Sequence, residues 1–169
     1  MMKKLRKSLQ IASVLALALS LSACASNDPV EEKVLPDGGV ARQLTASNHC
    51  GLTAPGLVHL SGPGELATFQ DGSAQHLSLA AAEKLDFERE HLLIVSLGQK
   101  STGGYGVTLA SSNLRDDVLR IKVEVRTPPE DSMVTQALTT PCAVLAVTAT
   151  GWEKLHVSGE GLPEMVRNR

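Results

Sequence analysis

The sequence predicts an all-β domain, mainly an antiparallel sandwich or a partly open barrel, with one short helix. Residues 119–126 alternate between apolar and charged side chains, the period of a strand with one face on a core and one in water. Residues 91–97 and 143–150 are largely apolar on both faces, as in strands covered on both sides. Glycine and proline punctuate the segments between such runs.

Residues 1–23 are predicted to be a removable signal peptide. Four basic residues precede an apolar stretch at residues 11–21. As a helix this stretch would rise about 16 Å, too short for a bilayer core of about 30 Å, and its length is typical of a signal peptide. Leu21-Ser22-Ala23-Cys24 then resembles the lipobox of bacterial lipoproteins, in which the signal peptidase cuts before a lipid-modified cysteine. The alternative is an ordinary secretory signal followed by a chance cysteine.

Lipidation of Cys24 would attach the protein to a membrane. One acyl chain binds a bilayer only marginally, whereas the three chains of mature lipoproteins would hold firmly. Ala25 follows the cysteine, and no aspartate stands there, which resembles the outer-membrane class of Gram-negative lipoproteins. We therefore expect an outer-membrane lipoprotein of the cell envelope, periplasmic or surface-facing, that reaches its membrane through Cys24.

Residues 24–47 are predicted to be the lipidated cysteine and a flexible tether, and residues 48–169 a single β-rich domain. The tether contains Asn27-Asp28-Pro29 and Pro36-Asp37-Gly38-Gly39, and charge, proline and glycine together disfavour a packed element. An ordered N-terminal arm is the alternative.

Charge and residue pattern argue against several classes of function. Without the basic residues of the signal peptide, twelve Lys and Arg face eighteen Asp and Glu, a formal charge of −6. This balance, with few aromatic residues, argues against nucleic-acid binding. The histidines lack the spacing of zinc ligands, and no serine lies in a Gly-x-Ser-x-Gly turn. We expect no metal, no cofactor and no catalytic residue, and the chain is predicted not to be an enzyme.

Cys50 and Cys142 remain once Cys24 carries lipid. An even pair of cysteines in an oxidising compartment is predicted to form a disulfide. On the chain-entropy account, closing a loop of about 90 residues stabilises the fold by roughly 4 to 5 kcal/mol. Two separate buried thiols are the alternative.

The first half of the domain is predicted to hold two short strands and the helix. Pro55-Gly56 and Gly62-Pro63-Gly64 interrupt this stretch and leave residues 57–60 and 66–70 as strands. Ser78 is placed to cap a short helix over residues 79–85, which are rich in alanine. Residues 91–97 then form a central strand.

The second half is predicted to contain a hairpin and three further strands. Residues 105–110 and 119–126 alternate, and the turn formers of the connector at 111–117 make them a hairpin. Pro128-Pro129 ends the second strand, because proline cannot donate to a ladder. The remaining candidate strands, of which the last would lie at an edge, are residues 134–138, 143–150 and 154–158.

The segment between the central strand and the hairpin is the most unusual in the chain. It is polar, holds two adjacent glycines and ends in an aromatic residue. Its candidate partner-binding residues are Lys100, Ser101, Thr102, Gly103, Gly104 and Tyr105. Glycines let a partner approach the backbone closely, and loops on a rigid scaffold often carry binding. The alternative is that the glycines only satisfy the geometry of the turn.

This turn and its surroundings resemble the C-terminal domain of PrcB-type protease-complex subunits. Leu85-Asp86-Phe87, the strand at 92–95 and the turn at 98–105 follow the family's order: an Asp-Phe step, a hydrophobic strand, then Gly-x-x-x-Thr-Gly-Gly-Tyr before a hairpin. Pro128-Pro129 and Thr139-Thr140-Pro141 fit its later loop and its Thr-x-Pro step into a final strand. The resemblance covers residues from about 79 to 150.

The resemblance implies a non-enzymatic protein that binds or stabilises a partner, with an envelope protease complex as the leading partner and the 100–105 turn as the binding loop. In one respect the chain departs from the family. Cys142 stands where an aromatic residue is usual, which suggests that a bridge from Cys50 to Cys142 is specific to this subgroup.

A looser resemblance supplies the alternative, a periplasmic protease inhibitor. Thr102-Gly103-Gly104-Tyr105 is similar to the wedge loop of chagasin-type cysteine-protease inhibitors, but it has an extra glycine and lacks their Asn-Pro. Their second loop is matched only by Gly151-Trp152. Trp152, the single tryptophan, is predicted either to cap the core or to be an exposed interface anchor, since tryptophan is frequent at interface hot spots.

Replacing Cys24 with alanine should block lipidation and leave an uncleaved precursor, because the lipoprotein peptidase acts on the modified cysteine. Mass spectrometry of the membrane fraction should find acyl chains on Cys24 of the wild type and residues 1–23 still attached in the variant. A mature wild-type N-terminus without acyl chains would contradict the lipobox interpretation.

Overall fold

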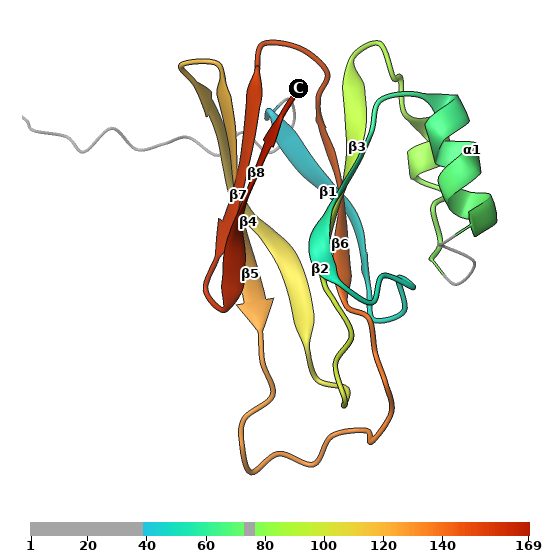
Figure 1. The fold of residues 1–169 in the computed structure, drawn as a ribbon, viewed down its shortest axis with the longest axis vertical. Helices are drawn as coiled ribbons and strands as arrows, with labels where there is room; N and C mark the ends of the chain where they lie inside the picture. Colours follow the sequence, from blue (N-terminus) through green and yellow to red (C-terminus); the bar gives the residue numbers. More distant parts are fainter. Residues whose placement is uncertain (1–38, 73–76) are drawn as a thin grey trace, which may run out of the picture. The chain divides into compact units, whose positions relative to one another are not determined.

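The computed structural model describes residues 39–72 and 77–169, which form two four-stranded β-sheets packed face to face (Figure 1). The predicted signal peptide, Cys24 and most of the predicted tether lie outside the described residues. The predicted all-β class with one short helix is confirmed in its sandwich form, since the strands make two separate sheets. Within the described ranges no helix is long and apolar enough to cross a bilayer.

The first sheet is antiparallel throughout and has the order β1-β6-β3-β2. Its central strands, β3 and β6, are buried at nearly every position, which confirms the two strands predicted to be covered on both faces. β2 confirms the strand predicted at 57–60. The strand bounds are β1 (Ala41–Ser47), β6 (Cys142–Thr148), β3 (Glu90–Leu97) and β2 (Pro55–Leu60).

The second sheet has the order β4-β5-β7-β8. Its strands are β4 (Gly106–Arg115), β5 (Val118–Arg126), β7 (Lys154–Gly159) and β8 (Leu162–Asn168). β5 and β7 are parallel, because the chain passes through β6 of the first sheet between them. The strand predicted at residues 154–158 is confirmed as β7, but its predicted place at an edge is wrong, since β8 pairs with the outer side of β7.

Two hydrophobic cores lie on the two faces of the first sheet. The larger core fills the space between the sheets and includes Leu93, Leu145, Ile121 and Leu155, all with an exposed fraction of 1% or less. The second core contains Leu92, Ile94 and Val144 and is covered by α1 (Pro63–Gly72) and the short 3-10 helix η1 (Ala82–Lys84). α1 lies beside the first sheet, on the face away from the second sheet (Figure 1).

The position of the helix differs from the prediction. Residues 66–70, predicted as a strand, lie in α1. Pro63 at the first helical position and Glu65, whose carboxylate accepts from the amide (2.5 Å) and hydroxyl (3.0 Å) of Ser61, are helix-start features. The Gly-Pro-Gly sequence thus begins a helix there, although it was interpreted as a break between strands.

The helix predicted at 79–85 is only the single 3-10 turn η1. The amides of Ala82 and Glu83 both donate to the carbonyl of Leu79, and Leu85 already has an extended backbone. Leu79 and Ala82 are buried in the second core, so packing holds this turn and the chain does not continue as an α-helix.

The predicted hairpin of β4 and β5 is confirmed, but its turn is shorter than expected. β4 continues to Arg115, and the turn consists of Asp116 and Asp117, both with positive φ (53° and 58°). Positive φ at both central residues is the geometry of a two-residue type I′ hairpin. A register shift between Leu109 and Ser111 interrupts the alternation, which is why the polar residues after it were assigned to a connector.

Two other segments also contradict the sequence prediction. β1 lies inside the predicted tether and pairs with β6 from Ala41 to Ser47, so the domain begins before residue 48. For these residues the alternative prediction of an ordered N-terminal arm is the correct one. Residues 134–138, predicted as a strand, form no strand and belong to the long connection between β5 and β6.

The predicted disulfide is present. Cys50 and Cys142 are bonded, with their Cα atoms 6.1 Å apart and both side chains fully buried. The bond fastens the segment after β1 to the first residue of β6, next to a hydrogen bond from the Cys50 amide to the Thr140 carbonyl (3.0 Å). It therefore ties two parts of the chain that are 92 residues apart.

In the native protein, Cys50 and Cys142 should resist alkylation until a reductant is added, because they are bonded to each other and buried. Replacing both with alanine should lower the free energy of unfolding by about 2 to 5 kcal/mol, measured by urea denaturation. Labelling of both positions without reductant would contradict the bond, and an unchanged free energy in the variant would contradict its stabilising role.

Candidate functional site

The 100–105 turn and the long connection formed by residues 127–141 meet at one end of the sandwich, which we call the loop end (Figure 1). Lys100 and Thr139 exchange backbone hydrogen bonds of 2.8 and 3.0 Å, and the Gly103 amide donates to the Thr135 carbonyl (2.8 Å). The Thr139 hydroxyl also donates to the Thr102 carbonyl (2.8 Å). The turn is therefore fastened along its length to the connection.

Only one of the two adjacent glycines is required by the backbone. Gly104 has φ +89°, and a Cβ atom there would lie 2.9 Å from the Cβ of Pro128 and 3.1 Å from Cγ1 of Val134. A Cβ at Gly103 would come no closer than 3.5 Å to Thr135, an ordinary contact. The structural alternative weighed from the sequence thus accounts for Gly104 and leaves Gly103 available for other roles.

The predicted binding residues differ in exposure. Ser101 is exposed, whereas the other five positions of the turn are half-buried. Tyr105 packs against the core between the sheets, and the Lys100 ammonium lies 5.4 Å from the centroid of its ring. The aromatic ring therefore packs beneath the turn, and Ser101 is the most exposed residue of the turn, with Lys100 and Thr102 partly exposed beside it.

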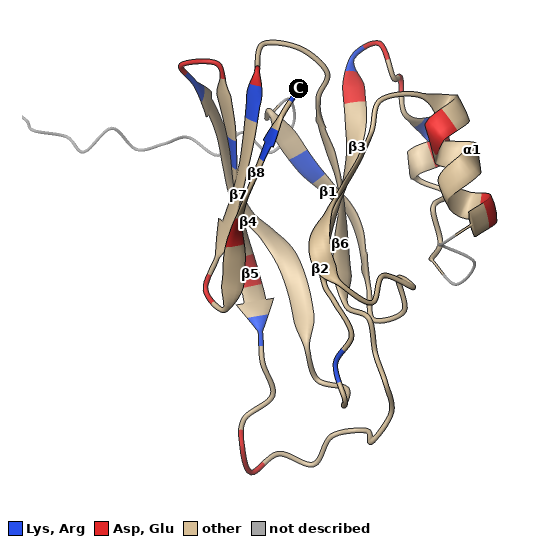
Figure 2. Cartoon of the chain, in the orientation of Figure 1, with Lys and Arg blue, Asp and Glu red and all other residues tan. Residues whose placement is uncertain are grey.

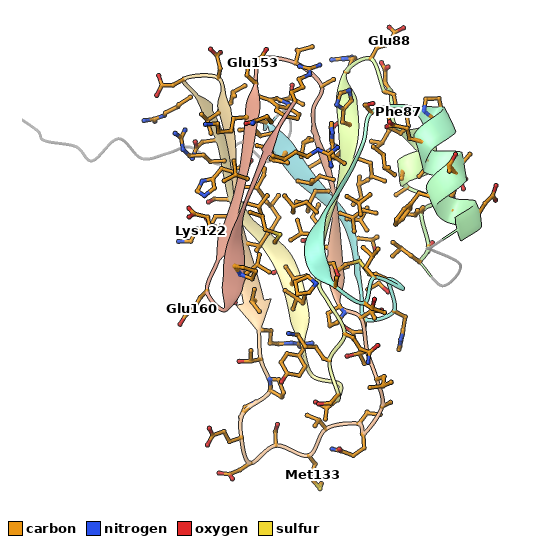
Figure 3. The ribbon with its side chains drawn as sticks, in the orientation of Figure 1. Phe87, Glu88, Lys122, Met133, Glu153 and Glu160 are labelled. Carbon is orange, nitrogen blue, oxygen red and sulfur yellow. A yellow bond between two sulfur atoms is a disulfide. The ribbon has the colours of Figure 1, made fainter. Side chains whose placement is uncertain are left out.

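The connection adds surface residues that the sequence interpretation missed. Met133 is completely exposed (103%) and Leu138 is 64% exposed, and Figure 3 shows Met133 at the outer limit of the loop end. Because residues 134–138 were predicted to form a strand, these exposed apolar side chains were not recognised as part of a loop surface. The sequence did contain a signal for this surface, because two apolar residues lie in a polar loop that begins with prolines and methionine is enriched at protein interfaces.

A cavity of about 370 Å³ adjoins the loop end, between the end of β1 and the start of β4. Its lining includes Ser47, Gly106 and the oppositely charged Glu124 and Arg126. Because it begins at the residue that follows Tyr105, it extends the polar surface of the turn toward the outer face of the hairpin.

Trp152 is a core residue, so its interpretation as an exposed interface anchor is wrong. Its exposed fraction is 1%, and its indole N–H donates to the Thr148 carbonyl (2.8 Å). Gly151, with φ +87°, turns the chain from β6 toward β7 and places the indole between the two sheets. A buried tryptophan with its N–H satisfied is a normal outcome for this side chain.

A histidine pair lies against Trp152, away from the loop end. His59 of β2 pairs in register with Leu93, a residue of the core between the sheets, and His59 Nε2 lies 3.0 Å from His91 Nδ1. The His59 ring also meets the Trp152 ring edge-on at 5.4 Å. One of the two facing nitrogens must carry a proton and donate a hydrogen bond to the other, so two neutral histidines can form this hydrogen bond with each other.

The surroundings of this pair disfavour its charged forms. Burial, followed by the charges of His91 and Arg167, lowers the pKa of His59 to about 4, although Glu65 opposes the shift. Burial and Arg169 likewise lower the pKa of His91. In the described part of the chain, no three His, Cys, Asp or Glu side chains are grouped to hold a metal ion.

One comparison with known proteins gives a match. Residues 92–148 match the protein family described as PrcB C-terminal, which confirms the resemblance predicted from the sequence. The matched segment runs from β3 to the end of β6, about a third of the chain, and contains the whole loop end. No curated protein and no solved structure matches the chain.

The histidine pair should make stability depend on pH. Because the folded-state pKa of His59 is about 4 and its ordinary value is 6.5, the unfolded chain takes up protons first as the pH falls. Stability is therefore fully present above about pH 6.5 and declines toward pH 4. The thermal midpoint at pH 5 should be lower than at pH 7.5, in a range where carboxylates of ordinary pKa are mostly ionised.

Replacing His59 and His91 together with glutamine should flatten this decline, whereas replacing the exposed His49 with glutamine should leave it in place. Equal pH dependence in the wild type and in the double variant would show that other groups are responsible.

Proposed function

We propose that the protein is a non-enzymatic, lipid-anchored lipoprotein of the outer membrane that binds or stabilises an envelope protease complex through its loop end. The observation that carries the proposal is the match of residues 92–148 to the PrcB C-terminal family, whose turn and long connection form this end of the sandwich. The lipobox residues before Cys24 support the anchor and the compartment.

The geometry of the loop end supports a role in binding. Its turn is fixed by backbone hydrogen bonds to Thr139 and Thr135, so little order has to be gained when a partner binds. Beside it stand the exposed side chains of Met133 and Leu138, which supply apolar area for a contact. Partner contacts of this kind need no reactive side chain, which agrees with a non-catalytic subunit.

The alternative of a protease inhibitor is less well supported. A wedge loop must project freely to enter an active-site cleft. Here Tyr105 packs against the core, and Pro128 and Val134 lie so near Gly104 that a Cβ atom there would collide with Pro128. The turn is thus partly covered by its own connection.

The proposal can be tested by crosslinking intact envelopes, capturing the protein and identifying its partner by mass spectrometry. Met133→Ser and Leu138→Ser should weaken capture of a protease subunit, with a hot-spot position costing about 2 kcal/mol or more in affinity. Lys100→Ala and Thr102→Ala should act in the same direction. All four should leave the thermal midpoint nearly unchanged, because these side chains do not lie in either core.

Val166→Ser is the matched control, because Val166 is also apolar and 59% exposed but lies on β8, outside the loop end. Equal loss of capture in this control would indicate a general effect of surface apolarity. Capture of a partner with no protease component, or undiminished capture by all four variants, would overturn the proposal.

A further inference from the structure

A groove lies on the outer side of the first sheet, between α1 and the connection from η1 into β3. Its volume is about 720 Å³, within the range of pockets that hold ligands. Apolar side chains from three segments line it: Leu66 from α1, Leu85 just after η1, and Phe87 just before β3. Leu66 is buried, whereas Leu85 and Phe87 are half-buried, so part of their apolar surface faces the groove and solvent.

Carboxylates surround this apolar floor. Glu83, Asp86 and Glu88 line the groove and are exposed. No Lys, Arg or His belongs to its lining among the described residues, although Lys84 and Arg89 neighbour the carboxylates along the chain. Figure 2 shows acidic positions on α1 and at the approach to β3, and Figure 3 shows Phe87 and Glu88 there. We call this feature the acidic groove.

Hydrogen bonds fix both walls of the acidic groove. The Gln70 amide donates to the Glu83 carboxylate (3.0 Å) and so connects α1 to η1. Asp86 accepts from the Glu88 amide through its side chain (3.1 Å), and its carbonyl accepts from the amides of Arg89 (2.9 Å) and Glu90 (2.8 Å). The groove therefore exists before any ligand arrives, which reduces the cost of binding.

We propose that the acidic groove binds a cationic peptide segment that inserts one apolar side chain between Leu66 and Phe87 and places Lys or Arg beside the rim. An apolar floor favours an apolar side chain, and three carboxylates with no cation in the lining favour positive charge around it. The same rim repels acidic segments, so the two features together select a peptide that is both apolar and basic.

This site is separate from the loop end. The groove lies at the start of β3, and the turn at 100–105 follows the end of the same strand. The inference therefore goes beyond the proposed function and does not depend on it, because neither the lipid anchor nor the protease partner enters the argument.

The test is a nuclear magnetic resonance titration of the isotope-labelled full chain at low salt with the capped peptide Lys-Lys-Phe-Lys-Lys. Backbone amide signals of Leu66, Leu85, Phe87 and Glu88 should shift. The matched peptides Lys-Lys-Ser-Lys-Lys and Glu-Glu-Phe-Glu-Glu should bind at least about tenfold more weakly, because each lacks one of the two features. Added salt should weaken binding of the first peptide, since rim charges are exposed and screened.

Glu83→Gln combined with Glu88→Gln should weaken the first peptide about fivefold, as expected for two exposed ion pairs. Glutamine at position 83 can still bond to Gln70, so the wall is kept. The control Glu160→Gln removes an exposed carboxylate outside the groove, after β7, and should change nothing.

Three outcomes would overturn the proposal: equal binding of the serine or glutamate peptide, signal shifts centred on another surface, or no shifts up to about millimolar peptide. Each leaves the protease-complex proposal standing, because that proposal concerns different residues.

Discussion

The antiparallel pairing of β3 with β6 is the constraint on which the rest of the structure depends. The two strands are in register from Glu90 with Thr148 to Ser96 with Cys142, and both are buried on their two faces. Because these backbone groups are buried, their amides and carbonyls must be satisfied within the ladder. The second sheet packs on one face of this pair and α1 with η1 on the other, which makes a three-layer arrangement from a chain with little aromatic content.

The ends of this buried pair position the surfaces that concern function. The 100–105 turn leaves β3, and the 127–141 connection enters β6, so both parts of the loop end are attached to the most deeply buried strands of the described chain. The Lys100–Thr139 bridge continues the pairing outward beyond the sheet. The acidic groove lies at the other end of β3. A change in one of these surfaces therefore need not alter the other, since the strand between them is held by its neighbours on both sides.

Apolar patterns were sufficient to predict β3, β5 and β6, because a strand face that is buried carries apolar residues, and this pattern can be seen in the sequence. The apolar patterns were insufficient where tertiary contacts determine the secondary structure of a segment. Gly62-Pro63-Gly64 was interpreted as a break, although it begins α1, and Asp116-Asp117 forms the hairpin turn only because a bulge near Ala110 shifts the register. The family resemblance located the 100–105 turn correctly. Its partial burial depends on Thr135 and Thr139, contacts more than 30 residues away that no local pattern encodes.

The order of the strands also determines when this protein can fold. Among the described residues, β1 has its ladder partner in β6, with Ala41 opposite Val147, and β5 pairs with β7 only after the chain has returned from the first sheet. Of the strand pairs described, only β2–β3 and β4–β5 have both partners before residue 142. High sequence separation of this kind slows folding, because loop-closure entropy must be overcome before distant contacts form. Both cores include residues of β6, so neither core can be complete until most of the sequence is available.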